Sequence, residues 1–140
     1  MATVPMDVRK VARCRELAVT AVAGDDGVGP LLGAIVALSG AGSDPPLRAF
    51  MIRKVEKAHG TAARIAGPLP VAGERVALVE DVVTTGGSAF RALDALAPTG
   101  VLVAEAIVLV DREEGAEVAL LERSLPLHAL FRRRDRKSVV

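Results

Sequence analysis

Residues 80–88 combine carboxylates, hydroxyl groups and glycines in one short stretch. The stretch reads Glu80, Asp81, Val82, Val83, Thr84, Thr85, Gly86, Gly87 and Ser88. The hydroxyl groups can donate hydrogen bonds to phosphate oxygens, and the glycines let the backbone approach an anion closely. The residues that follow have helical spacing, and the start of a helix offers unpaired N–H groups and a partial positive charge. The stretch therefore predicts a phosphate site.

Glu80 and Asp81 cannot serve the same phosphate, because like charges repel. Carboxylates at this position suit ribose hydroxyls or a magnesium ion instead. A ligand with a phosphate at one end and a hydroxylated, metal-bound sugar beside it satisfies both halves of the stretch. The alternative is an ordinary strand–turn–helix junction in which Ser88 caps the helix.

A second candidate region is rich in cations. Arg53, Lys54, Lys57 and His59 lie within residues 53–60, which show no apolar period. We expect a long loop here, and long loops in compact domains often act as lids over a site. Taken alone, the region is better described as a solvated basic loop with a surface histidine.

Arg112 is the third candidate. It follows the most apolar stretch of the chain, residues 101–110, and belongs to the string Asp-Arg-Glu-Glu-Gly at residues 111–115. A guanidinium group suits a ligand that carries carbonyl and carboxylate oxygens. A surface ion pair with Glu113 or Glu114 is the alternative.

Strands that alternate with helices must position these groups. We expect strands at 19–23 (or a last helical turn there), 47–52, 76–79, 101–110 and 126–131, and helices at 6–19, 28–38, 88–97 and 116–124. This alternation predicts an α/β doubly wound fold with a mainly parallel sheet flanked by helices. In such sheets ligands bind beyond the carboxyl ends of the strands, where all three candidate regions fall.

The helix faces can be assigned from spacing. In the first helix Val8, Val11 and Ala18 should face the core, while Arg9, Lys10 and Arg13 form a solvated face. In the last helix, the residues expected to face inward are Val118, Leu121 and Leu120 or Leu125. We expect His128, on the final strand, to be structural.

Composition limits the other possibilities. The chain has 140 residues, a formal net charge of +1 and one cysteine. We expect one domain over residues 1–140, with a core at 20–131 and a basic tail at 132–140. Near-neutral charge favours neither nucleic acid nor a membrane as a partner, and no signal peptide is recognisable. Cys14 should be a buried apolar residue in a reducing, cytoplasmic protein.

The strings at 53–60, 79–88 and 111–115 together resemble type I phosphoribosyltransferases, and the wording is most similar to the orotate branch. The resemblance covers roughly residues 20–131. It implies transfer of a phosphoribosyl group from Mg²⁺-bound phosphoribosyl pyrophosphate (PRPP) to orotate, which gives orotidine 5′-phosphate in UMP synthesis. It also implies a homodimer in which the 53–60 loop reaches the neighbouring subunit's site.

The resemblance assigns roles residue by residue. Lys57, His59 and Asp81 are implied as catalytic, with Lys57 and His59 assisting the departing pyrophosphate. The implied substrate-binding residues are Arg53, Lys54, Glu80, Val82, Val83, Thr84, Thr85, Gly86, Gly87, Ser88 and Arg112. Residues 27–34 look like the family's pyrophosphate-contacting loop, although Leu31 and Leu32 stand where the family often has polar residues. No protein side chain is expected to hold the metal directly.

The sequence departs from the family at its N-terminal end. Residues 1–19 precede the first expected core strand, whereas family members have a longer N-terminal hood that roofs the base pocket. Either the base is held differently or the chain is a truncated or divergent homologue. The alternatives are therefore a phosphoribosyltransferase for another base such as a purine, a non-catalytic PRPP or nucleotide sensor, and, more remotely, a phosphoacceptor domain built on Asp81.

Overall fold

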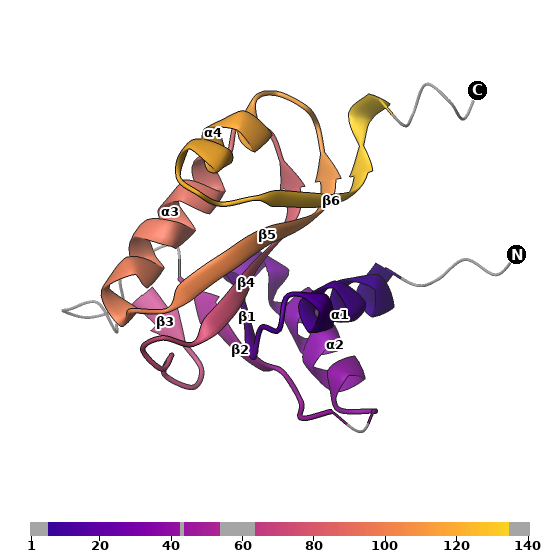
Figure 1. Cartoon of the computed structure of the whole chain (residues 1–140), viewed down its shortest axis with the longest axis vertical. Helices are drawn as coiled ribbons and strands as arrows, with labels where there is room; N and C mark the ends of the chain where they lie inside the picture. Colours follow the sequence, from indigo (N-terminus) through magenta and orange to yellow (C-terminus); the bar gives the residue numbers. More distant parts are fainter. Residues whose placement is uncertain (1–5, 43, 54–63, 135–140) are drawn as a thin grey trace, which may run out of the picture.

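A six-stranded sheet forms the centre of the protein in the computed structural model, which describes residues 6–42, 44–53 and 64–134 (Figure 1). The strand order is β3-β2-β1-β4-β5-β6. All neighbouring strands are parallel except β2 and β3, which are antiparallel. The strands are β1 (Ala21–Asp25), β2 (Arg48–Ile52), β3 (Ile65–Ala66), β4 (Arg75–Val83), β5 (Leu102–Asp111) and β6 (Leu127–Arg132).

Helices cover both faces of the sheet, as Figure 1 shows. One face packs against α1 (Met6–Glu16) and α2 (Gly29–Ser39), through a cluster that includes Cys14, Ile35 and Val79. The other face packs against α3 (Gly87–Leu96) and α4 (Ala116–Glu122), through a cluster that includes Leu78 and Leu120. Short 3₁₀ turns, η1 (Asp26–Val28) and η3 (Ala97–Thr99), adjoin α2 and α3. The predicted fold class is confirmed.

The two apolar faces of β4 explain its central place. Side chains at 76, 77, 78 and 79 are all fully buried and alternate between the two core clusters. The sequence of a strand that is covered on both faces is a continuous apolar run, without the alternation of apolar and polar residues seen in a half-exposed strand. However, β4 does not end at Val79 as predicted, because its pairing with β5 continues to Val83. Glu80 and Asp81 are therefore strand residues whose side chains lie on opposite faces of the sheet.

The prediction for the loop at 27–34 was wrong in extent. The chain leaves β1 through η1, and α2 already begins at Gly29 with Pro30 in its first turn, where a missing N–H costs nothing. Only residues 26–28 therefore connect the strand to the helix. The expected strand at 19–23 exists but is shifted to Ala21–Asp25.

The basic residues of α1 were also assigned wrongly. Lys10 is 1% exposed and so is not part of a solvated face. Arg13 donates from Nη2 to the buried carboxylate of Glu105 on β5, at 2.8 Å. The side of α1 that carries these cations thus packs against the sheet. Cys14 is buried as expected, and burial raises the pKa of its thiol to about 11.

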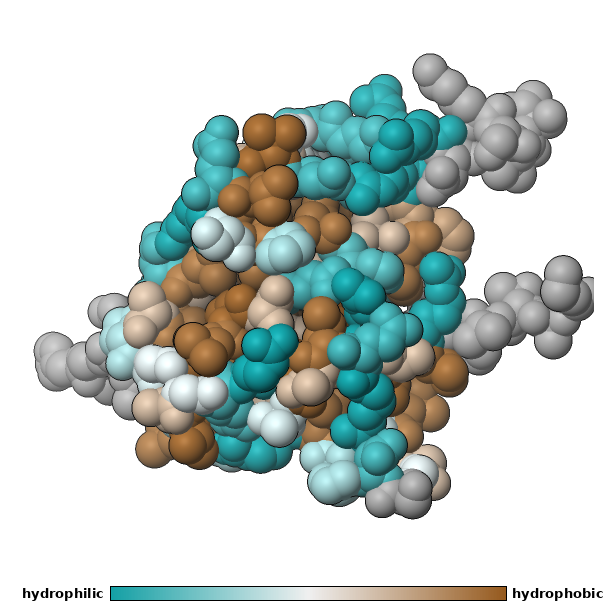
Figure 2. All heavy atoms as spheres, viewed as in Figure 1, coloured by the Kyte–Doolittle hydropathy of each residue, from teal (hydrophilic) through white to brown (hydrophobic). Residues whose placement is uncertain are grey.

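The inward face of α4 was predicted only in part. Leu120 and Leu125 are buried as expected, but Val118 and Leu121 are 66% and 60% exposed, and Ala116 is buried instead. Figure 2 shows apolar atoms at the surface over α4. The final strand ends at Arg132 rather than Phe131. Among the described residues, no helix is both long enough and apolar enough to cross a membrane.

Candidate active site

Four parallel strands deliver the candidate residues to one edge of the sheet. β1 ends at Asp25, β2 at Ile52, β4 at Val83 and β5 at Asp111. Because these strands are parallel, their carboxyl ends lie side by side, and the connections to the following helices form the walls of a ligand site.

The turn between β4 and α3 has the geometry of an anion site. Gly86 lies at the N-cap of α3 with a φ of 98°. A Cβ here would make only ordinary contacts with Phe90 and Ala116, so the preference for glycine comes from the backbone conformation, which would strain any other residue. No side chain caps the α3 N-terminus. The first-turn N–H groups of this ten-residue helix therefore remain available, next to the hydroxyls of Thr84, Thr85 and Ser88.

Glu80 is the most perturbed carboxyl group of the site. Its side chain is 5% exposed, and its Oε1 accepts a hydrogen bond from Ser88 Oγ at 3.3 Å. The pKa of Glu80 is raised to about 7, chiefly by burial and also by the charges of Asp25 and Asp81, against the opposing effects of Ser88 and Arg91. A buried carboxylate with only a hydroxyl donor beside it can accept further hydrogen bonds, for example from ribose hydroxyls.

The next two residues are far more accessible. Asp81 is exposed, and Val82 is 49% exposed despite lying within β4. Val83 is buried against Val108 and Ala116. Glu80 and Asp81 are thus adjacent in sequence but differ in environment: Glu80 is buried beside Ser88, whereas Asp81 faces solvent.

The connection after β1 adds carboxylates that the sequence interpretation did not select. Asp25 accepts the Gly27 N–H at 2.8 Å through Oδ1 and so caps η1. Its charge also acts on Glu80. A Cβ at Gly24 would lie 2.5 Å from Val28 Cγ2 and 2.8 Å from the Val79 carbonyl oxygen, so this backbone requires glycine.

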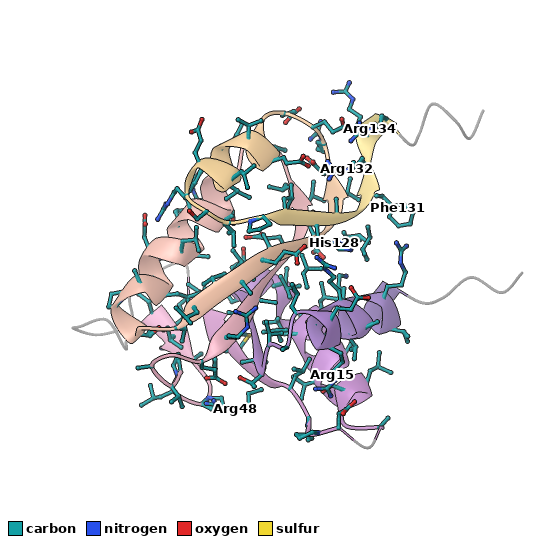
Figure 3. All side chains as sticks on the ribbon, viewed as in Figure 1. Arg15, Arg48, His128, Phe131, Arg132 and Arg134 are labelled. Atoms are coloured by element: carbon teal, nitrogen blue, oxygen red, sulfur yellow. The ribbon has the colours of Figure 1, made fainter. Side chains whose placement is uncertain are left out.

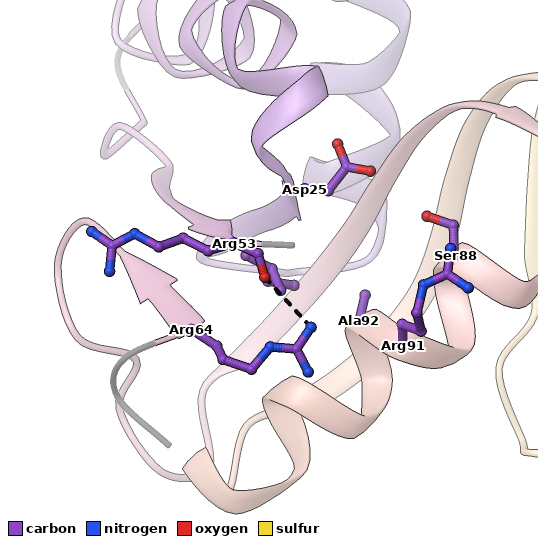
Figure 4. A pocket seen from close by; sticks show the side chains of 7 residues that line it. Asp25, Arg53, Arg64, Ser88, Arg91 and Ala92 are labelled. Carbon is purple, nitrogen blue, oxygen red and sulfur yellow. Dashed lines mark hydrogen bonds between the residues drawn. The ribbon is translucent and has the colours of Figure 1, made fainter. Parts of the chain in front are cut away.

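A pocket of about 240 Å³ lies between the ends of β1 and β2 and the first turns of α3 (Figure 4). It is lined by Asp25, Ile52, Arg53, Arg64, Ser88, Arg91 and Ala92. Arg64 donates from Nη2 to the Arg53 carbonyl oxygen at 3.4 Å, and Figure 4 shows its guanidinium group extending toward α3. Arg64 and Arg91 were not predicted. Arg91 lies three residues after Ser88, on the same side of the helix, so its spacing was a usable signal.

Arg112, the candidate for contact with a base, lies beside the turn between β4 and α3. The backbone N–H of Arg112 donates to the Val83 carbonyl oxygen at 3.0 Å, which ties the end of β5 to the end of β4. The Arg112 side chain is 55% exposed, and its Nη2 lies 3.8 Å from Glu114 Oε1. The structure therefore brings Arg112 next to residues 84–88. Lys54, Lys57 and His59 lie outside the described residues.

Comparison with known proteins identifies relatives of the chain. The family model of the phosphoribosyl transferase domain matches residues 28–120. Orotate phosphoribosyltransferase from Rhodopseudomonas palustris (strain BisB5) is 42% identical over 109 residues, which are 76% of this chain and 58% of the relative. The Methanopyrus kandleri enzyme of the same name is 44% identical over 108 residues, with 77% and 58% covered.

A solved structure supports the same relationship. Orotate phosphoribosyltransferase of Mycobacterium tuberculosis H37Rv in complex with PRPP superimposes with a TM-score of 0.67 at 30% identity, over 92% of this chain and 74% of the other. The chain spans about 58% of the length of the curated relatives it matches. The sheet, the β4–α3 turn and the matched family model agree, and the chain belongs to the phosphoribosyl transferase domain family.

Proposed function

We propose that the protein is an orotate phosphoribosyltransferase, which transfers a phosphoribosyl group from PRPP to orotate and releases pyrophosphate. The observation that carries this proposal is the buried Glu80, which accepts a hydrogen bond from Ser88 at 3.3 Å beside the uncapped start of α3. Arg112 lies at the same end of the sheet, because its N–H donates to the Val83 carbonyl oxygen at the end of β4. The identity to enzymes of that name supports orotate as the base.

The residues divide the substrate between them. Backbone N–H groups and hydroxyls at 84–88 bind the 5′-phosphate. Val82 and Val83, the last residues of β4, place this turn at the end of the strand. Glu80 accepts hydrogen bonds from the ribose hydroxyls. Asp81, which is exposed, supports the positive charge that develops on the ribose ring as the bond to pyrophosphate breaks.

Cations act on the leaving group. Arg53 lines the pocket at the end of β2, and we assign it, with Lys54, Lys57 and His59, to pyrophosphate. Each cation about 4 Å from an anion contributes roughly 4 kcal/mol before desolvation, at an effective dielectric constant near 20. Arg64 and Arg91 add positive charge on the same side of the site.

Magnesium fits the donor set, because Asp25 and Glu80 offer carboxylate oxygens near each other. No group of three or more potential metal ligands occurs in the described parts of the chain. We propose that oxygens of PRPP would supply most of the ligands of the Mg²⁺ ion. The bound ion would then neutralise negative charge on the leaving pyrophosphate. Arg112 orients the base through its carbonyl and carboxylate oxygens.

The wider assignment follows the same proposal. We propose a single domain with a core at 20–131 and a basic tail, acting in the cytoplasm in pyrimidine biosynthesis as a homodimer whose 53–60 loop reaches the partner's site. Because the chain spans only part of its relatives' length, two other activities remain as candidates. One is transfer to a purine base, and the other is PRPP binding without catalysis.

Pyrophosphate release decides between these functions. Mg-PRPP is incubated with the protein and orotate, adenine, guanine or hypoxanthine, and a reaction without base is the control. Orotate-dependent release supports the proposal. Release only with a purine supports the second activity, and PRPP binding by calorimetry without release under any condition supports the sensor.

Lys57→Ala tests the mechanism. Loss of one preorganised cation should lower kcat by roughly 100- to 1000-fold. The free energy of unfolding, measured with urea, should stay unchanged. Arg123→Ala removes a surface cation that pairs with Asp94 and is the control. Wild-type turnover in Lys57→Ala would remove this residue from the mechanism.

A further inference from the structure

A network of ion pairs outside the predicted site surrounds the turn that carries Arg112. Asp111, the last residue of β5, is 1% exposed. Its Oδ1 accepts the backbone N–H of Glu113 at 2.8 Å, and its Oδ2 lies 3.2 Å from Arg132 Nη1. The same nitrogen of Arg132 also pairs with Glu117 on α4. Arg132 therefore connects the residues that flank the turn 112–115 on both sides.

The turn needs such support because its backbone conformation is unfavourable. Glu113 has a φ of 59° and Gly115 a φ of 105°, so two of the four turn residues lie in the left-handed region. A non-glycine residue persists there only where the surroundings hold it. Within the described residues, Glu113 donates its N–H to Asp111, and its carboxylate contacts Arg134.

Arg132 is well suited to hold the carboxylates in place. It is the register partner of Asp111 in the β5–β6 pairing, and its side chain is 25% exposed. Figure 3 shows Arg132 and Arg134 at the end of β6, on the side of α4. Hydrogen bonding to Glu117 and the charges of Glu117, Asp111 and Glu113 raise the pKa of Arg132. The guanidinium group thus stays charged while it bridges the strand end and the helix.

We propose that Arg132 is a positioning residue for Arg112: through Asp111 and Glu117 it fixes the turn 112–115, so that the Arg112 guanidinium group faces the base while PRPP binding is left unaffected. This inference rests on the proposed function, since Arg112 is taken as the base contact. The link to the phosphate turn is the Arg112 N–H bond to Val83 and involves no side chain of Arg132.

Steady-state kinetics tests the inference on the full chain. For Arg132→Ala, we expect kcat/KM for orotate to fall roughly tenfold or more, because a displaced orienting group loses catalysis steeply. The KM for PRPP should change less than about twofold, since the phosphate contacts are untouched. Arg132→Lys keeps the positive charge but lacks the planar guanidinium group. It should therefore recover part of the kcat/KM that Arg132→Ala loses. Arg123→Ala, with its surface pair to Asp94, should match the wild type.

Amide hydrogen exchange provides a second measurement that needs no activity. The N–H groups of Arg112 and Glu113 should exchange roughly tenfold faster in Arg132→Ala than in the wild type, because local opening becomes easier. Unchanged exchange together with unchanged orotate kinetics would overturn the inference, as would an equal loss of orotate and PRPP affinity. If the wild type shows no orotate-dependent release, the proposed function fails, and the exchange rates alone then support or overturn the positioning role.

Discussion

Two buried glutamates, one on each face of the sheet, have very different hydrogen-bond and charge partners. Glu80 on β4 is 5% exposed and Glu105 on β5 is 3% exposed. Glu105 receives three hydrogen bonds from Arg13, at 2.8 to 3.1 Å, and lies 3.8 Å from His128 Nδ1. Glu80 has one hydroxyl partner at 3.3 Å, and its surroundings include two further carboxylates.

The difference separates a charge that is structural from one for which we propose a role toward the substrate. Paired and hydrogen-bonded, Glu105 joins α1 to β5 and leaves nothing for a ligand to satisfy. Glu80 instead has spare acceptor capacity beside a pocket, so its environment disfavours the charged form until a ligand supplies donors. Both residues follow apolar strand residues, and the sequence sets Glu80 apart only by the Thr- and Gly-rich turn that comes after it.

Arg13→Ala should have the largest effect on stability, because it leaves the Glu105 charge buried without its main partner. We expect a loss of about 3 kcal/mol in the free energy of unfolding, near the lower limit for breaking such pairs because Arg13 is 30% exposed. Urea unfolding at pH 7 measures it. Arg13→Met combined with Glu105→Leu should recover most of the loss, and a double variant as unstable as the single one would contradict this explanation.

Glu80→Gln should have the opposite effect on stability. The folded pKa of about 7 lies above the ordinary 4.5, so the folded state binds more protons and the wild type loses stability as pH rises from about 4.5 to 7. The total is roughly 2 to 3 kcal/mol over that window. Glu80→Gln should remove this slope and be more stable than the wild type at pH 8.

The same variant should lose activity. A neutral amide replaces an anionic acceptor, and hydrogen bonds to charged groups contribute roughly 1.5 to 3 kcal/mol, so kcat/KM for PRPP should fall by about 10- to 100-fold. Glu122→Gln, at an exposed position at the end of α4, should change neither the pH slope nor the kinetics. A Glu80→Gln protein with full activity would show that the buried carboxylate has no role toward the substrate.

The central layer of the fold was predictable because its signals are local. The apolar run of β4, the glycines of the turn, and Pro30 at the start of α2 each restrict the backbone where they stand. The apolar run and the glycines also define the β4–α3 turn that we propose binds phosphate, and the order of the elements places this turn at the strand ends.

The misassigned residues depend on contacts that are distant in sequence. Arg13 and Glu105 are 92 residues apart, so the helical period of α1 could not show that its basic side meets a buried carboxylate. In α4, the small Ala116 packs against Val83 and Val108 and sets the inward face, which rotates Val118 outward. Arg132 likewise resembled part of a basic tail until its partners Asp111 and Glu117 were known.

His128 allows the smallest and most specific test of the comparison. Burial, followed by the charge of Arg13, lowers the pKa of His128 below its ordinary 6.5. The folded state then binds fewer protons than the unfolded state, so this residue contributes stability above pH 6.5 that is lost as pH falls through its folded pKa. The sign is opposite to that of Glu80. The effect should be weaker, because the His128 side chain is 36% exposed.

The Glu80→Gln variant separates the two contributions to the pH dependence of the free energy of unfolding, one from Glu80 and one from His128. There the free energy of unfolding should decrease on acidification below pH 6.5, and adding His128→Gln should flatten that decrease. If the double variant keeps the same acid slope, His128 is not its source, and the Glu105 cluster would be insensitive to pH in this range. If the slope disappears, each face of the sheet carries its own titrating group, and only the group on the α3 face lies in the proposed active site.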